Sequence, residues 1–193
     1  GKPIGAYGDI TVFSFYATKI ATTGQGGMAA TNNKKYSDFT RDIIDDNGRD
    51  DYKLRYNYSL TDLAASVGNA QLDKVSLFIK QKEKIALAYQ SVLEKKNIEY
   101  WPKSKDKSIN YHRFILKFES EKERNNTREF FKKNGITAIV PLKTSELLHN
   151  CMKLDKKAFP NSEDIGQTIL SIPIYASLSK KQVERVCFVL KKL

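Results

Sequence analysis

Lys19 is the residue of this sequence best placed to act as a nucleophile. It follows the apolar, β-branched run Ile10–Phe15, which predicts a buried strand. A lysine that follows such a strand and lies among small residues is partly shielded from water, which makes its amine available as a nucleophile. Such an amine can form a Schiff base with a carbonyl, including the aldehyde of pyridoxal phosphate. From spacing alone, a surface lysine on a glycine-containing turn is the favoured interpretation, because a single lysine is a weak signal.

Hydroxyl and glycine residues around Lys19 could bind a phosphate group. They are Ser14, Thr18, Thr22, Thr23, Gly24, Gly26 and Gly27. Hydroxyls and the backbone N–H groups of a glycine-rich turn both donate hydrogen bonds to anions. The segment GQGG nevertheless has neither the dinucleotide-binding spacing nor the lysine of a P-loop, which argues against a nucleotide-binding loop of either kind.

Other catalytic chemistries find little support. His112 and His149 are far apart in the sequence, and it contains no HExxH, CxxC or aspartate-rich motif, so we predict no metal site. No GxSxG motif is present, which argues against an α/β-hydrolase nucleophile. Cys151 and Cys187 lack metal-ligand spacing and favour unpaired thiols in a reducing compartment.

The net charge of +11 is unevenly distributed. Residues 1–72 contain eight basic and eight acidic residues, so the whole excess lies in residues 73–193. Such an excess could attract nucleic acid, an anionic membrane or a phosphorylated small molecule. Because most of it is lysine mixed with glutamate and glutamine in helical patterns, we interpret it as a solvated helix surface. We therefore expect no nucleic-acid partner and, without an apolar run of membrane-spanning length, no membrane partner.

The elements that must position Lys19 are short. The pattern predicts strands over 10–15 and 26–32, a helix over 37–48 capped by Ser37, and a loop over 49–59. A helix of small residues then begins at Ser59 or Thr61, and a long helix covers 74–96.

Strand and helix patterns alternate in the rest of the chain. We predict strands over 111–118 and 136–141, and helices over 119–135, 162–172 and 179–193. This order is typical of a small α/β layer.

Two longer segments resemble motifs of a known family. GDITVFSFYATKIATTGQGGMAATN (8–32) is similar to the lysine segment of the DegT/StrS-type sugar aminotransferases, and YNYSLTDLAASVGNAQLDK (56–74) resembles their second motif. YHRFILKF (111–118) and the segment 159–186 resemble a later strand and the C-terminal motif of the same family. The resemblance therefore extends over nearly the whole chain.

The resemblance implies the C-terminal half of a fold-type I, pyridoxal-phosphate-dependent transferase, an α/β fold. Residues 1–75 would be the remainder of the large cofactor-binding domain with a dimer-interface helix. Residues 76–193 would be the linking helix and the small C-terminal domain. Family members are about twice this long, so the half that supplies the partner of the pyridine nitrogen would lie elsewhere, in a separate N-terminal half if the chain is complete.

The resemblance also assigns residues. Lys19 would hold pyridoxal 5′-phosphate covalently and transfer the proton during the reaction, and Ser14 would bind the phosphate. Asn57 would reach the phosphate of the neighbouring subunit's cofactor, which implies a homodimer. His112 matches a histidine that opens a strand in many relatives, and we consider it either a substrate-side residue or a partly buried structural one.

Departures from the family pattern concern substrate recognition. Gln25 replaces a glutamate, Ser59 replaces an arginine, and the segment 140–154 lacks the usual histidine-, tyrosine- and proline-rich loop.

The function implied is transamination of a nucleotide-linked keto-sugar, with glutamate as amino donor, in surface polysaccharide or glycoside biosynthesis in the cytoplasm. The alternative is a truncated, non-catalytic family fragment that acts as a binding protein or has no activity of its own.

Overall fold

The computed structural model describes residues 2–45, 48–96, 98–102 and 108–193. It divides into two compact units, Gly1–Ser76 and Leu77–Leu193.

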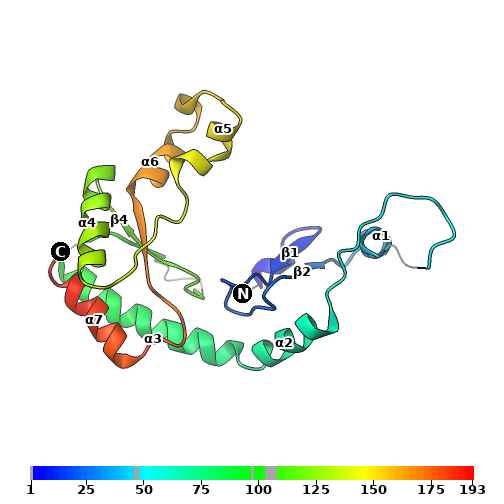
Figure 1. The fold of residues 1–193 in the computed structure, drawn as a ribbon, viewed down its shortest axis with the longest axis horizontal. Helices are drawn as coiled ribbons and strands as arrows, with labels where there is room; N and C mark the ends of the chain where they lie inside the picture. Colours follow the sequence, from blue (N-terminus) through cyan, green and yellow to red (C-terminus); the bar gives the residue numbers. More distant parts are fainter. Residues whose placement is uncertain (1, 46–47, 97, 103–107) are drawn as a thin grey trace. The chain divides into compact units, whose positions relative to one another are not determined.

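The first unit is built on a pair of short strands (Figure 1). After the 3₁₀ turn η1 (Ile4–Ala6), β1 (Thr11–Ser14) pairs antiparallel with β2 (Gly27–Ala30). The register places Thr11 opposite Ala30 and Ser14 opposite Gly27. Both strands were predicted, but the expectation that Ile10–Phe15 form a buried strand was wrong, because Val12 is 78% exposed and Phe13 is 39% exposed among the described residues. The loop between the two strands contains Lys19.

Two helices follow in this unit, α1 (Lys34–Ile44) and α2 (Asp62–Leu72). The prediction of Ser37 as the first cap was wrong. Asn33 caps α1 instead, because its side chain accepts a hydrogen bond from the Lys35 N–H. Of the two caps considered for α2, the structure has Thr61, whose side chain accepts from the Ala64 N–H.

No described residue of the first unit is fully buried. Large apolar side chains are instead exposed on each of its elements, including Val12 on β1, Met28 on β2, Phe39 on α1 and Leu63 on α2. Exposed apolar surface of this extent is typical of a surface that another protein segment covers.

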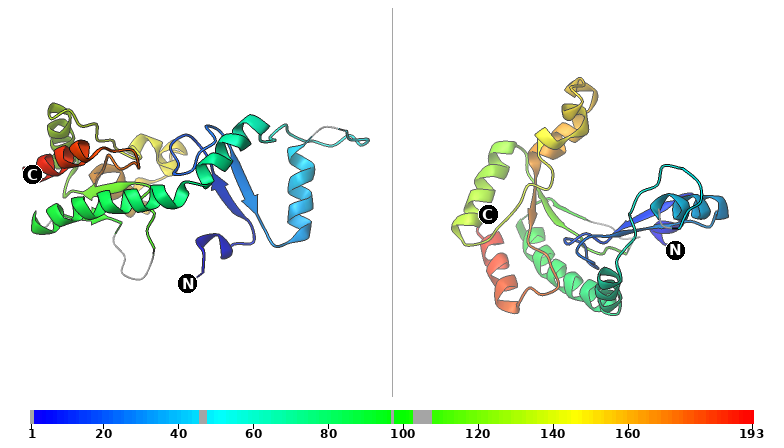
Figure 2. Two further views of the ribbon diagram at one scale, coloured as in Figure 1. Left: turned by 90° about the horizontal axis from the view of Figure 1, so that it is seen from below. Right: turned by 45° about the vertical axis from the view of Figure 1, so that its right-hand side comes forward.

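The second unit consists of a three-stranded antiparallel sheet with helices around it (Figure 1; Figure 2). In chain order its elements are α3 (Val75–Leu93, which begins at the end of the first unit), η2 (Glu94–Lys96), β3 (Tyr100–Trp101), β4 (Phe114–Lys117), α4 (Glu121–Lys133), η3 (Thr144–Glu146), α5 (Leu148–Cys151), η4 (Lys156–Ala158), α6 (Pro160–Thr168), β5 (Ile169–Ile172) and α7 (Lys180–Leu190). The strand order is β3-β4-β5.

Two predictions in this unit were wrong. The segment predicted as one helix over 162–172 is a helix only to Thr168, and Ile169–Ile172 form β5. All four residues of β5 are buried, and packing against β4 overrides the helical pattern. The strand predicted over 136–141 is reduced to one bridge, in which Ile139 and Ser171 exchange backbone hydrogen bonds.

The hydrophobic core lies in the second unit. Tyr89 on α3 makes an edge-to-face contact with Phe114 on β4, and Phe114 also stacks on Tyr100 of β3. Phe131 of α4 and Leu190 of α7 are fully buried in the same core. This arrangement confirms the small α/β layer predicted for the second part of the chain. None of the described helices is long and apolar enough to cross a membrane.

Candidate functional site

The loop after β1 holds Lys19 in a short turn closed at its base. Phe15 N–H bonds Gly26 O at 2.9 Å, and Thr23 N–H bonds Phe15 O at 2.9 Å. The Thr22 hydroxyl donates to Phe15 O at 3.0 Å and accepts from the Gly24 N–H at 2.9 Å. The threonines of this sequence therefore bond the backbone of the loop itself and close it at its base. Lys19 lies at the end of the loop opposite this base.

The Lys19 side chain is half-buried. Its backbone N–H bonds Tyr16 O at 2.9 Å. Within the described part of the chain the ammonium group makes no hydrogen bond or ion pair, so no carboxylate neutralises it there. An amine in this position is accessible to a carbonyl compound.

Glycines allow neighbouring elements to approach this loop closely. A Cβ atom at Gly27 would lie 2.9 Å from the Phe13 carbonyl oxygen across the strand pair. A Cβ atom at Gly68 of α2 would lie 2.8 Å from Thr23 Cγ2. These distances are too short for a side chain, so the small residues noted in the sequence allow α2 to contact the lysine loop.

Ser14 ends β1 and its side chain is exposed. Its Oγ accepts a long hydrogen bond, 3.4 Å, from the Tyr16 N–H. That contact uses an acceptor site and leaves the hydroxyl proton available for another group, such as a phosphate oxygen.

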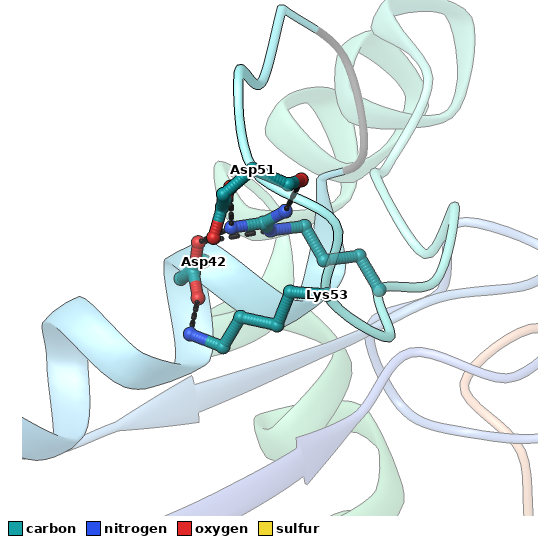
Figure 3. Close-up of polar contacts among 4 residues, drawn as sticks. Asp42, Asp51 and Lys53 are labelled. Atoms are coloured by element: carbon teal, nitrogen blue, oxygen red, sulfur yellow. Dashed lines mark hydrogen bonds and ion pairs between the residues drawn. The ribbon is translucent and has the colours of Figure 1, made fainter.

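The segment before α2 is held against α1 by an ionic network (Figure 3). The Arg55 side chain, only 6% exposed, donates from Nε and Nη2 to Asp42 Oδ1 at 2.9 and 2.8 Å. Arg55 Nη2 also bonds Asp51 Oδ1 at 2.8 Å, and Lys53 pairs with the other oxygen of Asp42. Hydrogen bonds from Lys53 and then Arg55 lower the pKa of Asp42 below its usual 3.8.

Backbone hydrogen bonds fix the same segment on both sides of Asn57. Tyr56 N–H bonds Ile43 O at 2.8 Å, and Tyr58 N–H bonds Ile44 O at 3.1 Å. The rings of Tyr56 and Tyr58 stack at 4.9 Å with an interplanar angle of 3°. Asn57, between them, is exposed, and its side chain has no partner among the described residues. The predicted loop is thus irregular but firmly anchored. Nothing in the sequence pattern had pointed to Asp42 or Arg55.

His112 belongs to the second unit and precedes β4. It is half-buried, its N–H bonds Asn110 Oδ1 at 3.1 Å, and its carbonyl accepts from Lys82 Nζ at 3.4 Å. Burial lowers the pKa of Lys82 to about 8. His112 also lines a cavity of this unit, together with residues of the 135–139 segment and α7.

His149 is a structural residue. It is 5% exposed, stacks on Phe159 at 4.6 Å, and its Nε2 lies 2.8 Å from Glu163 Oε1, which also accepts from Asn150 Nδ2 at 2.7 Å. The hydrogen bond with His149 is the main cause of the lowered pKa of Glu163. Across the residues that the structure describes, no group of three or more potential ligands could hold a metal ion.

Ser14, Lys19 and Asn57 all lie in the first unit, but no hydrogen bond or ion pair among the described residues joins them. Two cavities of this unit, one beside β2 and α1 and one beside α2, have linings that include none of the three. Ser14 and Asn57 are therefore exposed hydrogen-bond donors, and Lys19 is an amine with no partner among the described residues. The three side chains do not form a preassembled network.

A family model decides the relationship of this chain. The model of the DegT/DnrJ/EryC1/StrS aminotransferase family matches residues 1–191. The chain belongs to this family.

Curated relatives include sugar-modifying enzymes. The chain is 31% identical to a GDP-perosamine synthase of Escherichia coli O157:H7, with 97% of this chain and 52% of the relative aligned. It is 29% identical to the UDP-4-amino-4,6-dideoxy-N-acetyl-beta-L-altrosamine transaminase of Campylobacter jejuni, over 96% of this chain and 52% of the relative. The chain spans about half the length of the curated relatives it matches.

A solved structure has the same fold. The putative sugar aminotransferase Spr1654 from Streptococcus pneumoniae, in its PMP form, superposes with a TM-score of 0.87 at 26% identity, covering all of this chain and 52% of that one. The fold-class prediction for this family member, an α/β fold that is the C-terminal half of a fold-type I transferase, is confirmed.

The residues of this family member fit pyridoxal phosphate chemically. Lys19 offers an amine that has no ionic partner in the described part of the chain, and Ser14 offers an exposed hydroxyl that is free to donate. A group carrying both an aldehyde and a phosphate matches this pair of functions.

Proposed function

We propose that this protein is a pyridoxal-phosphate-dependent aminotransferase that acts on a nucleotide-linked keto-sugar in surface polysaccharide or glycoside biosynthesis. The observation that carries the proposal is the family match over residues 1–191. The matched range includes Lys19, in the loop that follows β1, whose amine has no hydrogen-bond or ionic partner among the described residues. Relatives named for GDP- and UDP-linked sugars support the substrate class. Glutamate as amino donor and a cytoplasmic location stay predictions.

In this proposal Lys19 has two roles. Bound pyridoxal phosphate supplies the electron sink that the movement of an amino group requires. The Lys19 amine would hold the cofactor through its aldehyde carbon and, when displaced by the amino donor, would carry a proton between two carbons of the reacting system. The half-buried position of Lys19 suits both roles, because the amine is accessible yet restricted in its motion.

Ser14 and Asn57 would bind the phosphate group. The Ser14 hydroxyl would donate to it from the end of β1, within the same subunit. Asn57 would donate from a neighbouring subunit, and the anchoring of its segment to α1 supports such a role because a fixed donor loses little entropy on binding. His112 on the substrate side is a prediction that its place in a cavity lining supports.

We further propose that residues 1–75 belong to the large cofactor-binding domain and residues 76–193 to a linking helix and small domain. The absence of fully buried residues in the described part of the first unit supports a homodimer, in which a second subunit covers apolar side chains of that unit.

The visible absorbance of bound cofactor tests the proposal. Full-length protein incubated with pyridoxal phosphate is expected to show the absorbance of covalently bound cofactor. Lys19→Ala should lose it, while Lys35→Ala, at an exposed position of α1, should retain it. Absence of the band from the unaltered protein would falsify the proposal and favour the non-catalytic alternative. A keto-sugar turnover assay then separates an active enzyme from a protein that only binds cofactor.

A further inference from the structure

A cavity in the second unit combines two arginines with an apolar floor. Its volume is about 430 Å³, which is within the range of small-molecule sites, roughly 300–1,000 Å³. Arg113, just before β4, and Arg185, on α7, contribute its strong positive charges, and the described lining contains no aspartate or glutamate.

The Arg185 guanidinium is held in place by the end of α4. Its Nε donates to Asn134 O at 2.8 Å, which leaves the two terminal nitrogens for another partner. Gly135, with φ 69°, makes room for the group: a Cβ there would lie 3.1 Å from Arg185 Nη2. The backbone of this turn thus orients one half of the guanidinium and leaves the other half free.

Arg113 is half-buried and makes no hydrogen bond or ion pair with any described residue. A partly desolvated guanidinium without a counter-ion is unfavourable, and an anionic ligand would remove that cost. Thr137, Ser171 and Gln182 add neutral polar groups to the lining, while Ile136, Ile172 and Pro173 supply apolar surface.

We propose that this cavity binds a phosphate-bearing small molecule, with its phosphate groups between Arg113 and Arg185 and its uncharged part on the isoleucine and proline surface. Two guanidinium groups match the charge of a phosphate or pyrophosphate better than that of a single carboxylate. Each guanidinium group can also donate two parallel hydrogen bonds to two oxygens of one phosphate. The site resides entirely in the second unit and needs no pyridoxal phosphate. Only the choice of nucleotides as ligands rests on the proposed function.

Calorimetric titration of the full-length protein with pyrophosphate, GDP and UDP tests this site. Arg113→Gln and Arg185→Gln should each weaken binding by about tenfold or more, which corresponds to about 1.4 kcal/mol. The matched control is Arg128→Gln, an exposed arginine of α4 outside the lining, which should bind as the unaltered protein does. Thermal unfolding checks that each variant is folded. Because Arg185 also bonds Asn134, Arg185→Gln can unfold the protein, and in that case the binding result of Arg113→Gln decides the outcome.

The site is refuted if none of the three ligands binds at millimolar concentration, or if Arg128→Gln weakens binding as much as Arg113→Gln, since the attraction would then be diffuse. Equal binding of uridine, which lacks phosphate, would also refute it. Competitive inhibition of keto-sugar turnover by pyrophosphate would support the phosphates of the substrate as ligand, and non-competitive inhibition would support a separate phosphorylated effector at the same site. Cofactor absorbance recorded on the same samples reports on the proposed function independently of this site.

Discussion

The proposed chemistry depends on single side chains. Ser14 is an example of a side chain whose replacement should affect ligand binding and not the fold. Its hydroxyl is exposed at the end of β1 and accepts only one long bond, so the fold does not depend on it. A change in Ser14 should therefore alter ligand binding without altering stability.

Ser14→Ala is expected to weaken pyridoxal phosphate binding by about tenfold to a hundredfold, because a hydrogen bond to a charged group contributes roughly 1.5–3 kcal/mol. Spectroscopic titration with the cofactor measures this. Ser14→Thr should restore much of the affinity, and Ser76→Ala, exposed on α3, should change nothing. Unchanged affinity in Ser14→Ala would remove Ser14 from the phosphate site.

Lys82 provides a pH-dependent prediction at the same scale. It is 5% exposed, and burial lowers its pKa from 10.5 to about 8. Below pH 8 both the folded and unfolded states carry the charge, and the folded state is destabilised. Between about 8 and 10.5 the unfolded state binds the extra proton, so stability rises with pH.

We expect Lys82→Met to be more stable than the unaltered protein at pH 7 by roughly 1–3 kcal/mol, and this advantage should shrink between pH 8 and 10. Urea unfolding at pH 7 and at pH 10 measures the difference in the free energy of unfolding between the variant and the unaltered protein. An advantage that does not vary with pH would mean that the pKa of Lys82 is the same in the folded and unfolded states, so that burial does not lower it.

At the scale of elements, the strand pair and the anchored segment before α2 position the candidate site. β1 and β2 approach so closely at Gly27 that a Cβ would meet the Phe13 carbonyl oxygen at 2.9 Å. Gly27→Ala should lower stability by about 1–3 kcal/mol, as overpacking does, and should weaken cofactor binding through displacement of Ser14, which pairs with Gly27. Thermal unfolding and cofactor titration check both effects. Gly48→Ala, at φ 64° with no described atom within 4 Å of its Cβ position, should also lower stability through backbone strain but should leave cofactor binding unchanged.

The anchored segment should respond to acid. Because the pKa of Asp42 is lowered in the folded state, its stabilising effect is complete above pH 3.8 and is lost as the pH falls below that value. Protection is the exchange rate of an amide relative to the unfolded chain at the same pH. We expect the amides of Tyr56 and Tyr58 to lose protection in Arg55→Ala at neutral pH, and in the unaltered protein only below about pH 4. Arg55→Lys should restore part of the protection. Unchanged exchange in Arg55→Ala would show that the backbone bonds to Ile43 and Ile44 suffice.

For the whole molecule, the two units differ in how they are stabilised. All fully buried described residues lie in the second unit, from Lys82 to Leu190. Slowly exchanging amides should therefore concentrate in residues 82–190, while protection of β1 and β2 should increase with protein concentration if a second subunit covers them. Hydrogen exchange at several protein concentrations measures both. Protection of β1 and β2 that is independent of concentration would argue against the homodimer.

Local sequence patterns predicted much of this protein. Three features were predicted: the strand before Lys19, the start of the last helix at Ser179, which caps α7, and the helix of small residues, α2. Each depends on residues a few positions apart, so propensity and spacing suffice to predict it. The resemblance of the lysine segment to a family motif added the family, which the match over residues 1–191 confirms.

Only the tertiary structure decided the remaining features, because they depend on contacts between residues far apart in the chain. Ile169–Ile172 have a helical pattern, yet they form β5 because β4 offers backbone partners and buries all four side chains. Arg55 meets Asp42, thirteen positions earlier, and Arg113 shares a cavity with Arg185. The sequence by itself determined that Lys19 follows a strand within a family motif. The fold determined that its amine has no ionic partner among the described residues, since that depends on which distant charges the chain brings near it.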